Sequence, residues 1–256
     1  MVTQDRFLTF FLPMGPDIDS KLRKLEDILQ SLEKTRNISE LEVRCRNLDG
    51  PDSGSEKIRI GRLIICRPGS LAKVGPEEIL IILDAGMTFG TGEHPSTILA
   101  LTEMQEFFNP PLGWPPRTMA NVLDVGTGSG ILALAAVFLG AEQVTAIDRD
   151  PVAIAVARHN SELNSLTDRI FFQEAGPDQV TGQFDLIMAN LVPSVIVRTA
   201  QKLTRLLVKD GQMIVAGFAD LQAPQVVGAL TKAGLLVKKS SSRDGWTVVT
   251  AIKDET

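Results

Sequence analysis

In the second half of the chain, short apolar runs alternate with longer segments in which apolar residues recur every three or four positions. The short runs predict strands, and the recurring positions predict amphipathic helices. Such alternation is typical of a parallel sheet with helices on both faces, joined by right-handed crossovers. The expected strands are 122–125, 144–147, 170–172, 186–189 and 213–216. One expected helix starts at 131, and three others cover 151–163, 193–208 and 221–233.

The final part of the sequence departs from this alternation. Two apolar stretches, 235–239 and 246–252, follow each other without a helical segment between them. They predict an antiparallel hairpin at one edge of the sheet. The fold class we predict is therefore α/β, a Rossmann-like parallel sheet with a C-terminal antiparallel hairpin, preceded by a small α+β unit.

The small unit is expected over 1–75 and the larger domain over 76–256. A proline-rich linker, 109–116, should end a helix that begins near Pro95, because proline cannot continue a helix. The small unit is predicted to have the order β-α-β-β, with strands at 6–12 and 41–45, a helix at 18–32, and a further strand or hairpin at 58–66.

The composition and net charge of the chain limit the kinds of partner that it is expected to bind. The chain has 256 residues, of which 44% are hydrophobic, and a formal net charge of -5. Without excess positive charge we expect no direct nucleic-acid partner. Cys45 and Cys66 lack metal-ligand spacing, so no metal is expected and a cytoplasmic location fits. A charged leader and a membrane-length apolar run are both missing from the sequence, so no membrane partner is expected.

The strand at 122–125 leads into a turn with three glycines, Gly126, Gly128 and Gly130. At the carboxyl end of such a strand, glycines let the backbone approach a ligand closely, and the helix that follows offers free N–H groups. A dinucleotide fingerprint needs its third glycine one position later, where Ile131 stands, and avoids a carboxylate such as Asp124. The turn suits S-adenosylmethionine, which has no phosphate and carries positive charge.

Two polar residues stand at the carboxyl ends of later strands, Asp148 on the second and Asn190 on the fourth, which is expected beside the glycine-turn strand. Asp148 stands where a Rossmann sheet places the acid that accepts hydrogen bonds from ribose hydroxyls. Asp150, before Pro151, is the better helix cap by position, which leaves Asp148 for the ribose. Asn190 is expected to be catalytic, its carbonyl accepting from a substrate amine and aligning it. The alternative for Asn190 is a cap on the following helix.

The segment 84–97 is too rich in glycine and polar residues for a core strand and is expected to form a lid or ligand loop. Phe89 is expected to stack on adenine or exclude water, and Thr97 to hydrogen-bond the methionine end. His94 is more typical of a loop-stabilising residue than of a base, and His159 of a surface residue. The residues expected at the cofactor are Phe89, Thr97, Gly126, Thr127, Gly128, Gly130, Asp148 and Asn190.

Together these segments resemble the bacterial methyltransferases that modify ribosomal large-subunit protein eleven, the stalk-base protein. The resemblance covers about Pro68 to the end and is most specific at 89–97, Phe-Gly-Thr-Gly-Glu-His-Pro-Ser-Thr. It implies a class I methyltransferase fold and an S-adenosylmethionine-dependent N-methyltransferase. In that family the recognition domain is longer and carries tryptophans, whereas Trp114 and Trp246 here lie after the first unit.

The resemblance also implies the acceptor, a protein lysine or N-terminal amine, in a ribosomal protein. A small-molecule amine or another protein is the alternative substrate, and the first unit decides between them. Two other classes remain: a nucleotide-binding oxidoreductase, which Ile131 disfavours, and a silent cofactor-binding module, which Asn190 and the lid loop disfavour.

Overall fold

A computed structural model describes residues 57–70, 74–84, 92–110 and 119–253. Residues 54–256 form one compact unit. No helix in these four ranges is both long and apolar enough to cross a membrane. The first strand, helix and second strand predicted for the N-terminal unit lie outside the described residues, and the division at residue 75 stays a prediction.

The larger sheet has seven strands in the order β6-β5-β4-β7-β8-β10-β9. The first five strands in this order pair in parallel, and β10 is antiparallel to both β8 and β9. The Rossmann-like sheet with a C-terminal antiparallel hairpin is thus confirmed. The strands are β4 (Ala120–Val125), β5 (Ala141–Asp148), β6 (Ile170–Glu174), β7 (Phe184–Asn190), β8 (Leu207–Ala219), β9 (Leu235–Arg243) and β10 (Trp246–Lys253).

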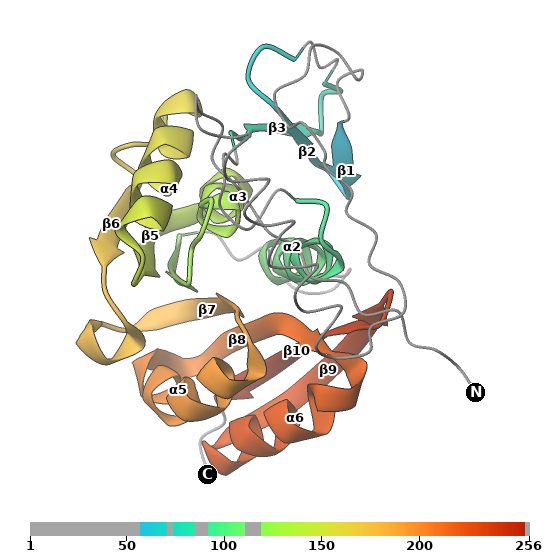
Figure 1. Ribbon diagram of the computed structural model, residues 1–256, viewed down its shortest axis with the longest axis vertical. Helices are drawn as coiled ribbons and strands as arrows, with labels where there is room; N and C mark the ends of the chain where they lie inside the picture. Colours follow the sequence, from blue (N-terminus) through green and yellow to red (C-terminus); the bar gives the residue numbers. More distant parts are fainter. Residues whose placement is uncertain (1–56, 71–73, 85–91, 111–118, 254–256) are drawn as a thin grey trace, which may run out of the picture. The chain divides into compact units, whose positions relative to one another are not determined.

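Helices cover both faces of this sheet (Figure 1). Alternate residues of β7 face opposite cores: Leu186 and Met188 pack with one set of helices, and Ile187 and Ala189 with the other. This is the two-residue period of a strand buried on both faces. One face carries α2 (Pro95–Phe108), α3 (Ile131–Leu139) and α4 (Pro151–Leu163), and the other carries α5 (Pro193–Leu206) and α6 (Ala223–Lys232).

Two helix boundaries were predicted wrongly. The helix expected to run to Val208 ends at Leu206, because Leu207 takes an extended backbone and begins β8. The helix expected from Leu221 begins at Ala223, after a short 3-10 turn at Asp220–Gln222. Apolar side chains continue through both boundaries, so hydrophobic periodicity alone does not locate them.

A second, three-stranded sheet packs against the α2–α3 side of the core. It consists of β1 (Ile58–Ile60), β2 (Leu63–Cys66) and β3 (Ile79–Ile82), with β1 antiparallel and β3 parallel to β2. Residues 58–66 thus form a hairpin, one of the two structures that the sequence left open for this segment. Leu63, Ile65 and Ile81 are buried in the same core as α2 and α3.

The order of the strands in the larger sheet indicates where a ligand-binding site is expected. Sequential crossovers run outward from β4 through β5 to β6, and then from β7 to β8 on the other side. The adjacent strands β4 and β7 therefore form the point where the winding reverses, and open α/β sheets bind ligands beyond the carboxyl ends of strands at such a point.

Candidate functional site

The turn after β4 adopts the backbone conformation that its glycines predict. Gly126, Gly128 and Gly130 have φ of 73°, 53° and 84°, a region that L side chains rarely adopt. A Cβ on Gly130 would lie 3.0 Å from the Cβ of Ala157 on α4. The predicted strand, turn and helix are thus present, and the turn is packed too closely for side chains.

Strand β5 holds this turn by its carboxyl end. The Ile147 carbonyl accepts from the N–H groups of Gly126 at 2.8 Å and Thr127 at 2.9 Å. Asp148 accepts from Gly128 N at 3.1 Å through Oδ2 and from Asp150 N at 3.0 Å through Oδ1. Asp148 therefore organises the turn, and each carboxylate oxygen keeps further acceptor capacity for a hydroxyl group.

The structure agrees with the division of roles expected for the two neighbouring aspartates. Asp150 accepts from Val152 N at 2.9 Å and caps α4, whose first residue is Pro151. Its carboxylate is thereby used at the helix start. Asp148 does not cap this helix. Its role as an acceptor for ribose hydroxyls stays a prediction.

Asp124 is fully buried beneath the turn. Thr127 Oγ1 donates to Asp124 Oδ2 at 2.7 Å, while Asp124 Oδ1 has no hydrogen-bond partner among the described residues. Burial raises the pKa of Asp124 to about 7. The Thr127 hydroxyl thus donates into the protein, and the expected contact of Thr127 with a cofactor stays a prediction.

Replacing Asp124 by asparagine is expected to remove a pH dependence of stability. The native state holds the Asp124 proton up to a pH of about 7, whereas the unfolded chain releases it near 3.8. Between these values the unfolded chain binds fewer protons, so the free energy of unfolding falls as pH rises. Denaturant unfolding between pH 4 and 8 should show the wild type losing stability relative to Asp124→Asn. A difference that is constant over this range would contradict the expectation.

Asn190 and Thr97 meet although they lie far apart in the sequence. Asn190 ends β7, and its Nδ2 donates to Oγ1 of the buried Thr97 at 3.2 Å. Asn190 Oδ1 is buried without a hydrogen-bond partner among the described residues. The following helix has Val192 at its cap position and no side-chain cap bond, so the capping alternative for Asn190 is wrong.

Gly217 on β8 is a site residue that sequence reasoning missed. It has φ of 94°, and a Cβ on it would lie 2.6 Å from the Leu191 carbonyl oxygen and 2.9 Å from Asn190 Oδ1. Only glycine lets β8 pass this close to the end of β7. The available signal was an isolated glycine inside an apolar strand, which often marks a close backbone approach.

His94 and His159 have the structural roles that the sequence favoured for them. His94 caps α2: its Nδ1 accepts from Ser96 N at 3.3 Å, and its ring lies edge-on to Trp246 with centroids 4.4 Å apart. Burial lowers the pKa of His94. His159 is half-exposed on α4, with Nε2 at 3.8 Å from an Asp84 carboxylate oxygen. Phe89 lies outside the described residues, and its expected stacking stays a prediction.

Comparison with known proteins decides the family. A model of the family described as Ribosomal protein L11 methyltransferase (PrmA) matches residues 53–254. The chain belongs to this family. The resemblance predicted from the glycine turn, the 89–97 segment, Asp148 and Asn190 is thereby confirmed.

Relatives within the ribosomal protein L11 methyltransferase family span most of this chain. The one from Desulfitobacterium hafniense is 35% identical over 244 residues, 92% of this chain and 75% of its own length. The one from Heliobacterium modesticaldum is 36% identical over 197 residues, 75% of this chain. The aligned part spans only 59% of that relative's length.

A solved structure from the same family supports the fold. The ribosomal protein L11 methylase of Lactobacillus delbrueckii subsp. bulgaricus superposes with a TM-score of 0.69 at 30% identity, covering 78% of this chain and 99% of that one. The fold of this L11 methyltransferase family member brings Gly126, Asp148 and Asn190 to the carboxyl ends of the adjacent strands β4, β5 and β7, as their places after the predicted strands indicated.

Proposed function

We propose that this chain is an S-adenosylmethionine-dependent N-methyltransferase that modifies lysine or N-terminal amines of a ribosomal protein. The observation that carries the proposal is the meeting of three features at adjacent carboxyl ends: the glycine turn of β4, Asp148 of β5 and the Asn190–Thr97 pair at β7. Family membership supports the protein substrate, because the relatives are named for ribosomal protein L11.

The residues present fit a cationic cofactor better than a diphosphate. Asp148 stands beside the turn, and Asp124, whose pKa burial raises to about 7, lies beneath it. The Asp148 carboxylate would repel a pyrophosphate but stabilise a ligand that carries ammonium and sulfonium groups, and a cationic ligand would also favour the ionised form of Asp124. This charge pattern also disfavours the oxidoreductase alternative. When bound, S-adenosylmethionine supplies a methyl group on an electron-poor sulfur.

The chain's own residues then have separate tasks. Asp148 is proposed to accept from the ribose hydroxyls while it holds Gly128 in place. The side-chain oxygen of Asn190 accepts from no donor among the described residues, and an amine N–H of the substrate would satisfy it. A lysine amine has a pKa of about 10.4, and a dry site that already contains a cation lowers it. Alignment by Asn190, rather than a strong base, is the proposed contribution to rate.

The direct test is transfer of a labelled methyl group from S-adenosylmethionine. The full chain is incubated with purified ribosomal protein L11 and, separately, with a bacterial lysate. We expect label on the ribosomal protein in both, located by mass spectrometry on lysine side chains or the N-terminal amine. Label found only on a small molecule or on unrelated proteins would contradict the proposed substrate.

Replacing Asp148 by alanine is expected to weaken binding of S-adenosylhomocysteine by about tenfold or more, because it removes an acceptor for the ribose and the anchor of Gly128. Titration calorimetry measures the effect. Asp185→Ala is the matched control, since Asp185 also accepts from a backbone N–H, that of Asn121, at the opposite end of the sheet. Equal affinity losses in the two variants would argue against the role of Asp148.

A further inference from the structure

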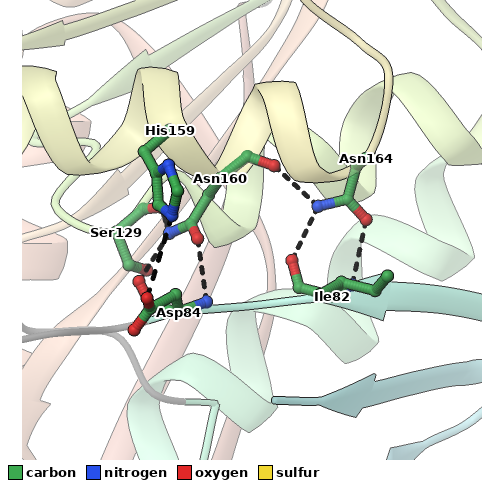
Figure 2. Close-up of polar contacts among 6 residues, drawn as sticks. All are labelled: Ile82, Asp84, Ser129, His159, Asn160 and Asn164. Carbon is green, nitrogen blue, oxygen red and sulfur yellow. Dashed lines mark hydrogen bonds and ion pairs between the residues drawn. The ribbon is translucent and has the colours of Figure 1, made fainter. Parts of the chain in front are cut away.

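Asn160 of α4 and Asn164, the residue at the C-terminal cap of that helix, together take the place of a strand beside β3 (Figure 2). Asn160 and Asn164 lie four residues apart, so their side chains share one face of the helix. Asn164 accepts from Ile82 N at 2.9 Å and donates to Ile82 O at 2.6 Å. Asn160 accepts from Asp84 N at 2.8 Å and donates to Asp84 O at 3.1 Å. The amides thereby satisfy the backbone edge of β3 and the residues just after it.

Asn160 makes one contact that Asn164 does not. Its Nδ2 also donates to the carbonyl oxygen of Ser129 at 2.8 Å, inside the glycine turn. Asn164 instead uses its amide nitrogen on the backbone carbonyl of Asn160, in the last turn of α4, at 2.7 Å. Asn160 is fully buried and its three polar contacts use both amide hydrogens and the oxygen. The two side chains therefore differ, because Asn160 holds the glycine turn and Asn164 does not.

The contact completes the anchoring of the turn. Strand β5 holds the N–H groups of Gly126, Thr127 and Gly128, as described above. Ser129 is held through its carbonyl by α4, and Ala157, one helical turn before Asn160, packs against Gly130. A buried amide that fixes a peptide plane sets the direction of neighbouring N–H groups.

We propose that Asn160 is a positioning residue for the cofactor: by holding the Ser129 carbonyl it keeps the glycine turn in its binding conformation. The inference rests on the proposed function. It separates Asn160 from Asn164, which supports β3 by similar hydrogen bonds but does not contact the turn.

The test compares Asn160→Ala with Asn164→Ala in the full chain. Each variant loses three hydrogen bonds, so similar decreases in melting temperature are expected. Binding of S-adenosylhomocysteine should weaken by about tenfold in Asn160→Ala and by less than about twofold in Asn164→Ala. In methylation assays, KM for S-adenosylmethionine should rise in Asn160→Ala while kcat changes little.

A second pair of variants covers the case in which an alanine variant does not fold. Asn160→Asp keeps the size of the side chain and the acceptor for Asp84 N but, when ionised, cannot donate to Ser129 O. Hydrogen exchange at Gly128 to Gly130 should become faster in Asn160→Asp and stay unchanged in Asn164→Asp. Equal affinities and equal exchange in the paired variants, with a wild type that binds, would overturn the positioning role. A wild type that binds no S-adenosylhomocysteine would overturn the proposed function itself.

Discussion

Replacing Gly217 by alanine is expected to reduce methyl transfer by at least about a hundredfold and to lower the free energy of unfolding by about 2 kcal/mol or more. The new Cβ would lie 2.6 Å from the Leu191 carbonyl oxygen and 2.8 Å from Leu191 N. Both are backbone atoms, so no side-chain rotation relieves the overlap. The end of β7 must shift, and Asn190 shifts with it. Steady-state kinetics and denaturant unfolding measure the two effects.

Gly234→Ala supplies the matched control for this variant. Gly234 has φ of 91°, close to the 94° of Gly217, but no atom of the described residues lies within 4 Å of the position of its Cβ. It therefore carries the same backbone strain without the collision. We expect a moderate loss of stability and near-normal turnover. If Gly217→Ala and Gly234→Ala behave alike, the close approach of β8 to Asn190 does not matter for activity.

Replacing Asn190 by alanine is expected to lower kcat by about a hundredfold to a thousandfold while changing the affinity for S-adenosylhomocysteine only a few-fold. The side chain is held by Thr97, and its oxygen has no donor in the part of the chain that the structure describes, an arrangement suited to aligning an amine. Single-turnover rates and calorimetry separate the two quantities.

Asn121→Ala is a suitable comparison for the Asn190 variant. Asn121 is exposed near the start of β4, at the opposite end of the sheet, and its replacement should leave activity intact. An Asn190→Ala protein that retains normal kcat but loses cofactor affinity would assign Asn190 to binding instead of alignment.

Features governed by local rules could be predicted from the sequence. The glycine turn was recognisable because positive φ at three nearby positions requires glycine, and Asp150 was recognisable as a cap because it precedes a proline. The parallel sheet followed from the alternation of strands with helices. In each case the residues that determine the structure are near neighbours in the chain.

Features that depend on distant parts of the chain were not predictable in the same way. The collision at Gly217 involves Leu191 at the end of a neighbouring strand, and the bond from Asn160 reaches back to Ser129, 31 positions earlier. The inward turn of the Thr127 hydroxyl depends on the buried carboxylate of Asp124 below it. A single sequence contains these residues but gives no sign of which of them meet.

Strand β10 lies between β8 and β9 in the sheet, although it is the last of the three to be synthesised. As the polypeptide emerges during translation, β9 leaves the exit tunnel before the strand that it pairs with. The hydrogen bonds on this side of the sheet can therefore form only after Trp246–Lys253 has emerged. Because β10 also supplies Trp246, the ring contact with His94, the residue that caps α2, forms at the same late moment.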